Sequence, residues 1–168
     1  MLPIARRWLA YVIVVLAACG SPSLSGRIFE NGRVRYRVGE LPEGWREIDA
    51  EGDVAFFHRE RASVISVNSR CDRHDDDVPL QSLTQHLLIG FTEREVASQD
   101  VIPFDGREAL RTVVSARLDG VPRQMVLYVM KKNGCVYDLL YAAPPDRFSE
   151  GAAEFDAFVR GFATEEPR

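Results

Sequence analysis

Three Asx-Gly dipeptides, placed at intervals of fourteen residues, constrain the fold of this chain more than any other feature. They are Asp105-Gly106, Asp119-Gly120 and Asn133-Gly134. Such dipeptides favour the tight two-residue turns that join antiparallel strands. The apolar, extended segments around them are residues 95–104, 107–119, 123–132 and 135–143. The sequence therefore predicts an antiparallel meander of four strands.

The third of these segments carries apolar side chains on both of its faces. Met125, Leu127 and Val129 alternate with Val126, Tyr128 and Met130. Because successive side chains of a strand point to opposite faces of its sheet, such a strand is buried on both sides. We expect another layer of structure on each face of the sheet.

Two segments with helical periodicity can supply these layers. In residues 79–93 the apolar side chains recur at three-and-four spacing, with Asp77 as a candidate N-cap and Pro79 in the first turn. A second helix is expected to begin near Pro145-Asp146. Its apolar face comprises Phe148, Ala152, Phe155, Phe158, Val159 and Phe162. The predicted fold class is α+β, with an antiparallel β-sheet flanked by helices in a single domain.

The part of the chain before the meander also has strand character. Residues 33–38 alternate apolar residues with arginines, as a half-buried strand requires, and residues 54–58 and 62–69 are further strands. Between them, Pro42 and Gly44 predict a bend in the chain. Trp45, directly after that bend, is expected to anchor the core.

The first twenty residues resemble the signal of a bacterial lipoprotein. Arg6 and Arg7 precede an apolar run, residues 8–17, that is too short to span a bilayer stably. The run ends in Leu16-Ala17-Ala18-Cys19-Gly20, which resembles a lipobox. The resemblance implies cleavage after Ala18 and lipidation of Cys19, and attachment by more than one acyl chain is lasting. An uncleaved anchor and a secretory signal without lipidation are the alternatives.

This N-terminus predicts the organisation and location of the protein. Residues 1–18 form the signal peptide, residues 19–32 a lipid-anchored tether and residues 33–164 the domain. The small, polar stretch 20–26 is typical of a flexible linker. Gly20 rather than aspartate after the lipidated cysteine favours the outer over the inner membrane, by resemblance to enterobacterial sorting. The domain then faces the periplasm.

Two further cysteines, Cys71 and Cys135, fit an oxidising compartment. They allow one pairing, and a disulfide that closes a loop of about 65 residues would stabilise the fold by about 4 kcal/mol in the chain-entropy model. Two buried free thiols are the alternative. Neither cysteine belongs to a Cys-x-x-Cys motif, so the sequence does not favour a redox function.

The order of elements resembles the Mog1/PsbP-like fold, which includes the DcrB-like lipoproteins. The residues that carry the resemblance are the strand and bend 36–45, the helix with Leu83 to Leu88, the hairpins through Asp105-Gly106 and Gly134, the strand 137–141 and the phenylalanine-rich last helix. It covers most of residues 33–163. The resemblance implies a sheet flanked by helices that serves as a binding or assembly module, and fold alone does not identify a partner.

Charge and motifs exclude several classes of function. Removal of the signal takes away two of 21 basic side chains and none of 25 acidic ones, so the mature chain has a formal charge of −6 and no basic stripe for nucleic acid. The acidic loop 71–77 departs from a calcium loop, and His58, His74 and His86 lack zinc-ligand spacing. No Gly-x-Ser-x-Gly motif is present. We expect no catalytic residue, no metal and no cofactor.

These observations predict a non-enzymatic, membrane-anchored periplasmic lipoprotein that binds a protein partner. The alternative is a carrier or sensor of a small apolar ligand or lipid, held in a groove between the sheet and the last helix. The aromatic residues that would line this groove are Tyr128, Tyr137, Tyr141, Phe148, Phe155, Phe158 and Phe162. Such residues more often form a core than a groove.

Overall fold

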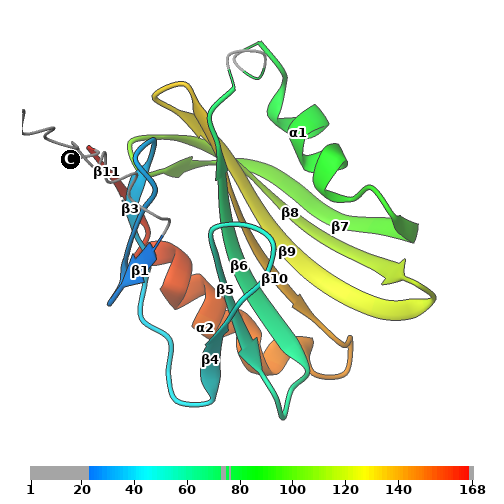
Figure 1. Cartoon of the computed structure of the whole chain (residues 1–168). Helices are drawn as coiled ribbons and strands as arrows, with labels where there is room; N and C mark the ends of the chain where they lie inside the picture. The colour runs from blue at the N-terminus through cyan, green and yellow to red at the C-terminus, as the bar shows by residue number, and fades with distance from the viewer. Residues whose placement is uncertain (1–22, 73–74, 76, 167–168) are drawn as a thin grey trace, which may run out of the picture.

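The computed structural model describes residues 23–72, 75 and 77–166, which form two antiparallel sheets and two helices (Figure 1). The larger sheet has seven strands in the order β4-β5-β6-β10-β9-β8-β7. They are β4 (Trp45–Ile48), β5 (Val54–His58), β6 (Ser63–Arg70), β7 (Phe91–Phe104), β8 (Arg107–Leu118), β9 (Val121–Lys132) and β10 (Cys135–Ala143). All of its pairs are antiparallel, so the predicted α+β class is confirmed.

The meander β7–β10 follows the predicted turns. At each of the three Asx-Gly dipeptides both residues have positive φ angles; for Asp105 and Gly106 these are 46° and 73°. Two successive residues with positive φ are the requirement of a type I′ turn, whose twist matches that of the strands it joins. The local turn chemistry therefore sets the order β10-β9-β8-β7 in the sheet.

A smaller sheet, with the order β1-β2-β3-β11, joins the two ends of the described chain. Its strands are β1 (Ser23–Ser25), β2 (Ile28–Glu30), β3 (Arg35–Arg37) and β11 (Ala163–Glu165). Arg35 of β3 forms ion pairs with Glu30 and Glu165, the latter at 2.8 Å. Strand β11 was not predicted, and it places the C-terminal end beside the N-terminal strands.

Strands β1 and β2 lie within residues 19–32, which the sequence predicted as a flexible tether. Phe29 of β2 is fully buried and stacks on Tyr36, with 5.0 Å between the ring centroids. The folded part therefore begins by Ser23 rather than at residue 33. The prediction was wrong because the small polar residues of β1 pair with β2, which in turn pairs with β3.

The two helices cover opposite faces of the larger sheet (Figure 1). Helix α2 (Phe148–Arg160) packs on β6 and β10, while α1 (Leu80–Leu87) packs on β8 and β9. Residues Met125 to Met130 of β9 are all buried, as their double-sided pattern predicted. Val126, Tyr128 and Met130 belong to the core on the α2 side, and their neighbours in sequence face α1.

Helix α1 is shorter than the predicted 79–93. Gly90 has a φ of +89°, which ends the helical path, and Phe91 already opens β7. The predicted cap is also wrong, because Pro79 holds the N-cap position without a side-chain hydrogen bond and Asp77 is exposed. Among the described residues no helix is long and apolar enough to cross a membrane.

A disulfide joins Cys71 and Cys135, whose Cα atoms are 4.0 Å apart. Cys71 follows Arg70 and Cys135 precedes Val136, so the disulfide lies next to the ladder pair Arg70↔Val136, where β6 ends and β10 begins. The bond therefore fastens two neighbouring strands that are 64 residues apart in sequence. This is the pairing that the sequence analysis favoured over two free thiols.

Candidate functional site

The residues that the sequence singled out do not converge on one site. Cys19, the predicted lipidation site, and the signal 1–18 lie outside the described residues. In the acidic loop 71–77, residues 73, 74 and 76 also lie outside them. Asp75 of that loop pairs with Arg70 at 2.8 Å. The described part of the chain brings no three His, Cys, Asp or Glu side chains together in a metal-binding group.

The aromatic side chains considered for an apolar groove form the core instead. Six of the seven are buried, and Phe148 packs against them as a partly buried neighbour. Their rings stack on one another, for example Tyr141 on Phe155 at 5.7 Å between centroids. The space between the sheet and α2 is thus filled by these rings.

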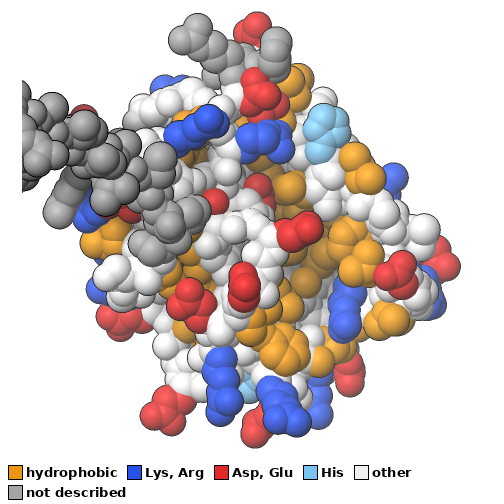
Figure 2. All heavy atoms as spheres, in the orientation of Figure 1, with side chains coloured by type: hydrophobic (Ala, Val, Ile, Leu, Met, Phe, Trp, Pro, Cys, Tyr) orange, Lys and Arg blue, Asp and Glu red, His pale blue; other side chains and the backbone are white. Residues whose placement is uncertain are grey.

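A polar pocket of about 550 Å³ lies where three loop segments meet at one end of the larger sheet. The segments are the bend before β4, the turn between β5 and β6, and the first turn of α2. They come together because β4 pairs with β5, which places Trp45 opposite His58. The pocket is lined by Glu43, Gly44, Arg46, His58, Arg59, Glu60, Arg61, Arg147 and Glu150. We call it the arginine pocket; Figure 2 shows basic and acidic side chains mixed at this lower end of the molecule.

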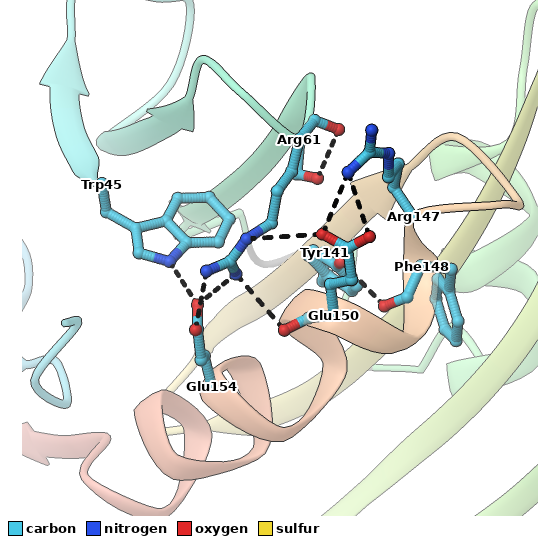
Figure 3. Close-up of polar contacts among 8 residues, drawn as sticks. Trp45, Arg61, Tyr141, Arg147, Phe148, Glu150 and Glu154 are labelled. Atoms are coloured by element: carbon cyan, nitrogen blue, oxygen red, sulfur yellow. Dashed lines mark hydrogen bonds and ion pairs between the residues drawn. The ribbon is translucent and has the colours of Figure 1, made fainter. Parts of the chain in front are cut away.

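Arg61 is fixed in place by Glu154 of α2 (Figure 3). Its Nη1 and Nη2 donate to Glu154 Oε2 and Oε1 at 2.7 and 3.0 Å, so the pair is bidentate. Trp45 Nε1 donates to the same Oε2 at 2.7 Å. The hydrogen bond from Arg61 lowers the pKa of Glu154. The ion pair links the β5–β6 turn to α2 and holds the guanidinium rigid at the wall of the pocket.

A second ion pair continues this network along the first turn of α2. Arg147 Nη1 donates to Glu150 Oε1 at 3.2 Å, and the other carboxylate oxygen of Glu150 lies 4.0 Å from Arg61 Nε (Figure 3). Arg61 Nη1 also donates to the backbone carbonyl of Glu150 at 3.3 Å. Arg61 and Arg147 therefore already have carboxylate partners within the protein.

The remaining charged side chains of the pocket have no such partner. Arg46 and Arg59 are exposed, and neither side chain forms a hydrogen bond or ion pair with any residue that the structure describes. The same holds, among the described residues, for the carboxylates of Glu43 and Glu60. The pocket thus presents two uncommitted guanidinium groups and two uncommitted carboxylates to solvent.

His58 forms part of the pocket wall, although only 5% of its surface is exposed. Its ring meets Trp45 edge-on, at 5.4 Å between centroids. Within the described residues its Nδ1 is the one buried side-chain nitrogen or oxygen that lacks a hydrogen-bond partner. An unsatisfied buried polar group costs about 1–3 kcal/mol. Because this nitrogen is buried, a ligand in the pocket does not reach it without movement of the ring.

Gly44 makes room for this imidazole. Its φ is +100°, and a Cβ atom there would lie 2.4 Å from His58 Nε2. A side chain at this position would displace the ring from the pocket wall. The Gly44 that the sequence analysis assigned to a bend therefore also shapes the site.

A second polar cluster links the two sheets through Asp53. Asp53 accepts hydrogen bonds from Tyr36 Oη of β3 at 3.1 Å and from Ser69 Oγ of β6. Asn68 Nδ2 donates to Asp138 Oδ1 at 2.8 Å. Burial raises the pKa values of both carboxyls, that of Asp138 to about 6. The internal partners of Asp53 indicate a structural link rather than a reactive site.

Comparison with known proteins identifies the fold. No family model and no curated protein matches the sequence. Cyanobacterial PsbP from Synechocystis sp. PCC 6803 is similar over 89% of this chain and 99% of its own, with a TM-score of 0.60 and 16% identity. LpqN of Mycobacterium tuberculosis, described as involved in cell envelope biogenesis, covers 78% of this chain and 84% of its own, with a TM-score of 0.57 and 12% identity.

The Ran-binding protein Mog1p of Saccharomyces cerevisiae gives a TM-score of 0.52 at 13% identity, over 83% of this chain and 95% of its own. The fold is therefore Mog1/PsbP-like, as the resemblance in the sequence implied. At such low identities the likeness concerns the fold alone, and the function must be argued from the site.

Proposed function

We propose that this protein is a lipid-anchored component of the bacterial cell envelope that binds a protein partner and catalyses no reaction. Its lipobox supports an anchor at acylated Cys19, and Gly20 favours the outer membrane. The Cys71–Cys135 disulfide suits an oxidising, extracytoplasmic compartment. The similarity of fold to LpqN and PsbP is consistent with an envelope or binding module.

The observation that carries the binding function is the contrast between a filled core and an open, charged pocket. The aromatic side chains pack on one another beneath α2. They fill the space in which the apolar-carrier hypothesis expects a groove. The arginine pocket instead offers uncommitted charges on a frame held by the Arg61–Glu154 pair. Polar surfaces of this kind recognise partners by charge complementarity.

The anchor is tested by expressing the full chain and its Cys19→Ala variant in a bacterial host fed an alkyne-bearing fatty acid. We expect label and membrane fractionation for the native chain, and loss of both for the variant. Unlabelled native protein released by osmotic shock would overturn the lipid anchor.

The binding function is tested by photo-crosslinking in the cells that naturally produce the protein. A benzophenone amino acid replaces Glu60 at the pocket or, as a control, Arg160 in the last turn of α2. A stoichiometric protein adduct at position 60 but not at position 160 is the expected result. Recovery of bound lipid without any protein adduct would instead favour the carrier hypothesis.

A further inference from the structure

We propose that the domain rests directly on the bilayer, with one end of the small sheet as the surface that meets the lipid headgroups. We call this surface the anchor end. It comprises β1, the turn 31–33 and the row of ladder partners that begins at Ser23, namely Glu30, Arg35 and Glu165. The proposal rests on the lipid anchor proposed above and adds the surface that this anchor brings to the membrane.

Strand β1 shortens the connection between the lipid and the folded domain. The sequence predicted a tether over residues 19–32, whereas β1 pairs with β2 from Ser23 onward and Leu24 packs against the core. Ser23 is only four positions after Cys19. Whatever its conformation, a chain of this length spans at most about 14 Å. The folded domain therefore stays within this distance of the acylated cysteine.

The length of this connection, and the lipid at its end, select the bilayer as the occupant of the anchor end. Acyl chains hold Cys19 at the membrane surface. A flexible tether over residues 19–32 would have let the domain move away by up to about 50 Å, whereas the short connection keeps Ser23 beside the headgroups. The charges of the row do not oppose this position, because Arg35 is paired with Glu30 and Glu165. The covalent anchor, rather than charge, holds this surface on the lipid.

The anchor end is the part of the domain nearest to the lipid, and the Asp119-Gly120 turn lies far from it. The backbone N–H of Thr164 in β11 donates to Asp105 Oδ2 at 3.0 Å, so the Asp105-Gly106 turn lies beside the small sheet. Strand β8 has 12 residues and leads from there to Asp119, which places the two turns about 36 Å apart. Figure 1 shows the same separation, with β1 at the left and the turn between β8 and β9 at the right.

A fluorescent amino acid reports how close each end of the domain lies to the lipid. Acridonylalanine replaces Ser25 or Arg33 at the anchor end, or Val121 beside the distant turn, and all three residues are exposed. The acylated full chain is purified, and its acylation is verified by intact mass. It is reconstituted into vesicles of phosphatidylethanolamine and phosphatidylglycerol that contain a lipid with a nitroxide headgroup. We expect the nitroxide to quench about half or more of the fluorescence at positions 25 and 33, and less than about half as much at position 121.

A variant with a longer tether is the matched control. Insertion of about 20 glycine and serine residues between Gly20 and Ser21 leaves the lipobox and the domain intact and raises the root-mean-square span from Cys19 to Ser23 to about 27 Å. Quenching at positions 25 and 33 should fall by about half or more in this variant. Circular dichroism verifies that each labelled protein is folded.

Equal quenching at the three positions, or quenching at positions 25 and 33 that the longer tether leaves unchanged, would overturn the inference. The intact mass keeps it apart from the proposed function. If the native chain carries no acyl groups, the lipid anchor fails and the membrane-facing surface fails with it. If the chain is acylated but is not quenched at positions 25 and 33, the anchor stands and only the membrane-facing surface is refuted.

Discussion

At the scale of single residues, Asp138 shows most clearly that burial in the fold makes ionisation of a carboxyl unfavourable. It lies in the middle of β10, where Asn68 of the neighbouring strand donates to its carboxylate at 2.8 Å. Burial nevertheless raises its pKa from 3.8 to about 6, and the nearby charge of Asp53 adds to this. Folding therefore favours the protonated carboxyl relative to the unfolded chain.

Asp138→Asn should stabilise the protein at neutral pH. Since the folded pKa lies above the unfolded one, the wild type loses stability as the pH rises from about 4 to about 6, whereas the amide does not titrate. We expect a gain of about 1–3 kcal/mol in the free energy of unfolding at pH 7.5. The gain should disappear near pH 3.5, where both states of the wild-type residue are protonated. Urea denaturation at the two pH values measures both differences.

Asp100→Asn is the matched control, because Asp100 is an exposed residue of β7. Its effect on the free energy of unfolding should stay within about 0.5 kcal/mol at either pH. A gain for Asp138→Asn that is equal at both pH values would contradict the raised pKa and point to packing instead.

At the scale of elements, α2 requires glycine at position 151, although helices usually favour alanine over glycine. Gly151 is buried within α2, and a Cβ atom there would lie 2.5 Å from Tyr141 Oη. That hydroxyl donates to the backbone carbonyl of Phe148 at 2.9 Å and is therefore not free to move. Although alanine in place of glycine normally stabilises a helix by about 1 kcal/mol, we expect Gly151→Ala to destabilise the protein by about 1–3 kcal/mol. Thermal and urea denaturation provide the measurement.

A double-mutant cycle with Tyr141→Phe identifies the cause. Without the hydroxyl the cost of Gly151→Ala should shrink by about half or more, since the nearest clashing atom is gone. Additive effects of the two substitutions would show that the clash is with the ring carbons of residue 141, at 2.9 and 3.1 Å, rather than with the hydroxyl.

The elements that the sequence predicted well are those specified by neighbouring residues. The Asx-Gly turns and the flanking apolar runs located the meander, and the bounds of β5 and β10 match the predicted 54–58 and 135–143. Helix α1 was predicted too long because its leucine periodicity continues past Gly90 to Phe91. Strand β11 was missed because its partner β3 lies far away in the sequence. Strand β1 pairs with the neighbouring β2 and was missed because its small, polar residues are typical of a linker.

The arginine pocket was not predicted, and its residues explain why. They come from three segments, around Gly44, His58 and Glu150, that no motif spacing relates. From the sequence, Trp45 was expected to anchor the core and His58 to end a strand, and both expectations hold without indicating a site. His58, Arg59 and Arg61 lie within four positions of one another in the sequence. This cluster of basic side chains at a turn was the one local feature that indicated a site.

At the scale of the whole molecule, the Cys71–Cys135 disulfide should contribute strongly to stability. It joins residues 64 apart in sequence, and closure of such a loop restricts the unfolded chain by about 4 kcal/mol in the entropic model. Cys71→Ala/Cys135→Ala should lower the free energy of unfolding by a similar amount. Urea denaturation of the double variant, and of the wild type with and without reductant, measures the loss.

The oxidation state itself is tested by alkylation of a Cys19→Ala chain followed by intact mass measurement. No alkylated thiol is expected before reduction and two are expected after it. Two alkylated thiols in the unreduced protein would refute the disulfide.

The pairing of β11 with β3 means that the small sheet is completed only after residues 163–165 have been synthesised. Strand β3 leaves the ribosome early, yet one of its two neighbours is formed by Ala163–Glu165, and the ion pair Arg35–Glu165 spans 130 residues. Such non-local contacts form late, since a long loop must close first. A chain that is truncated, or still being translated, leaves the edge of β3 open. The small sheet therefore closes only after residues 163–165 have been made.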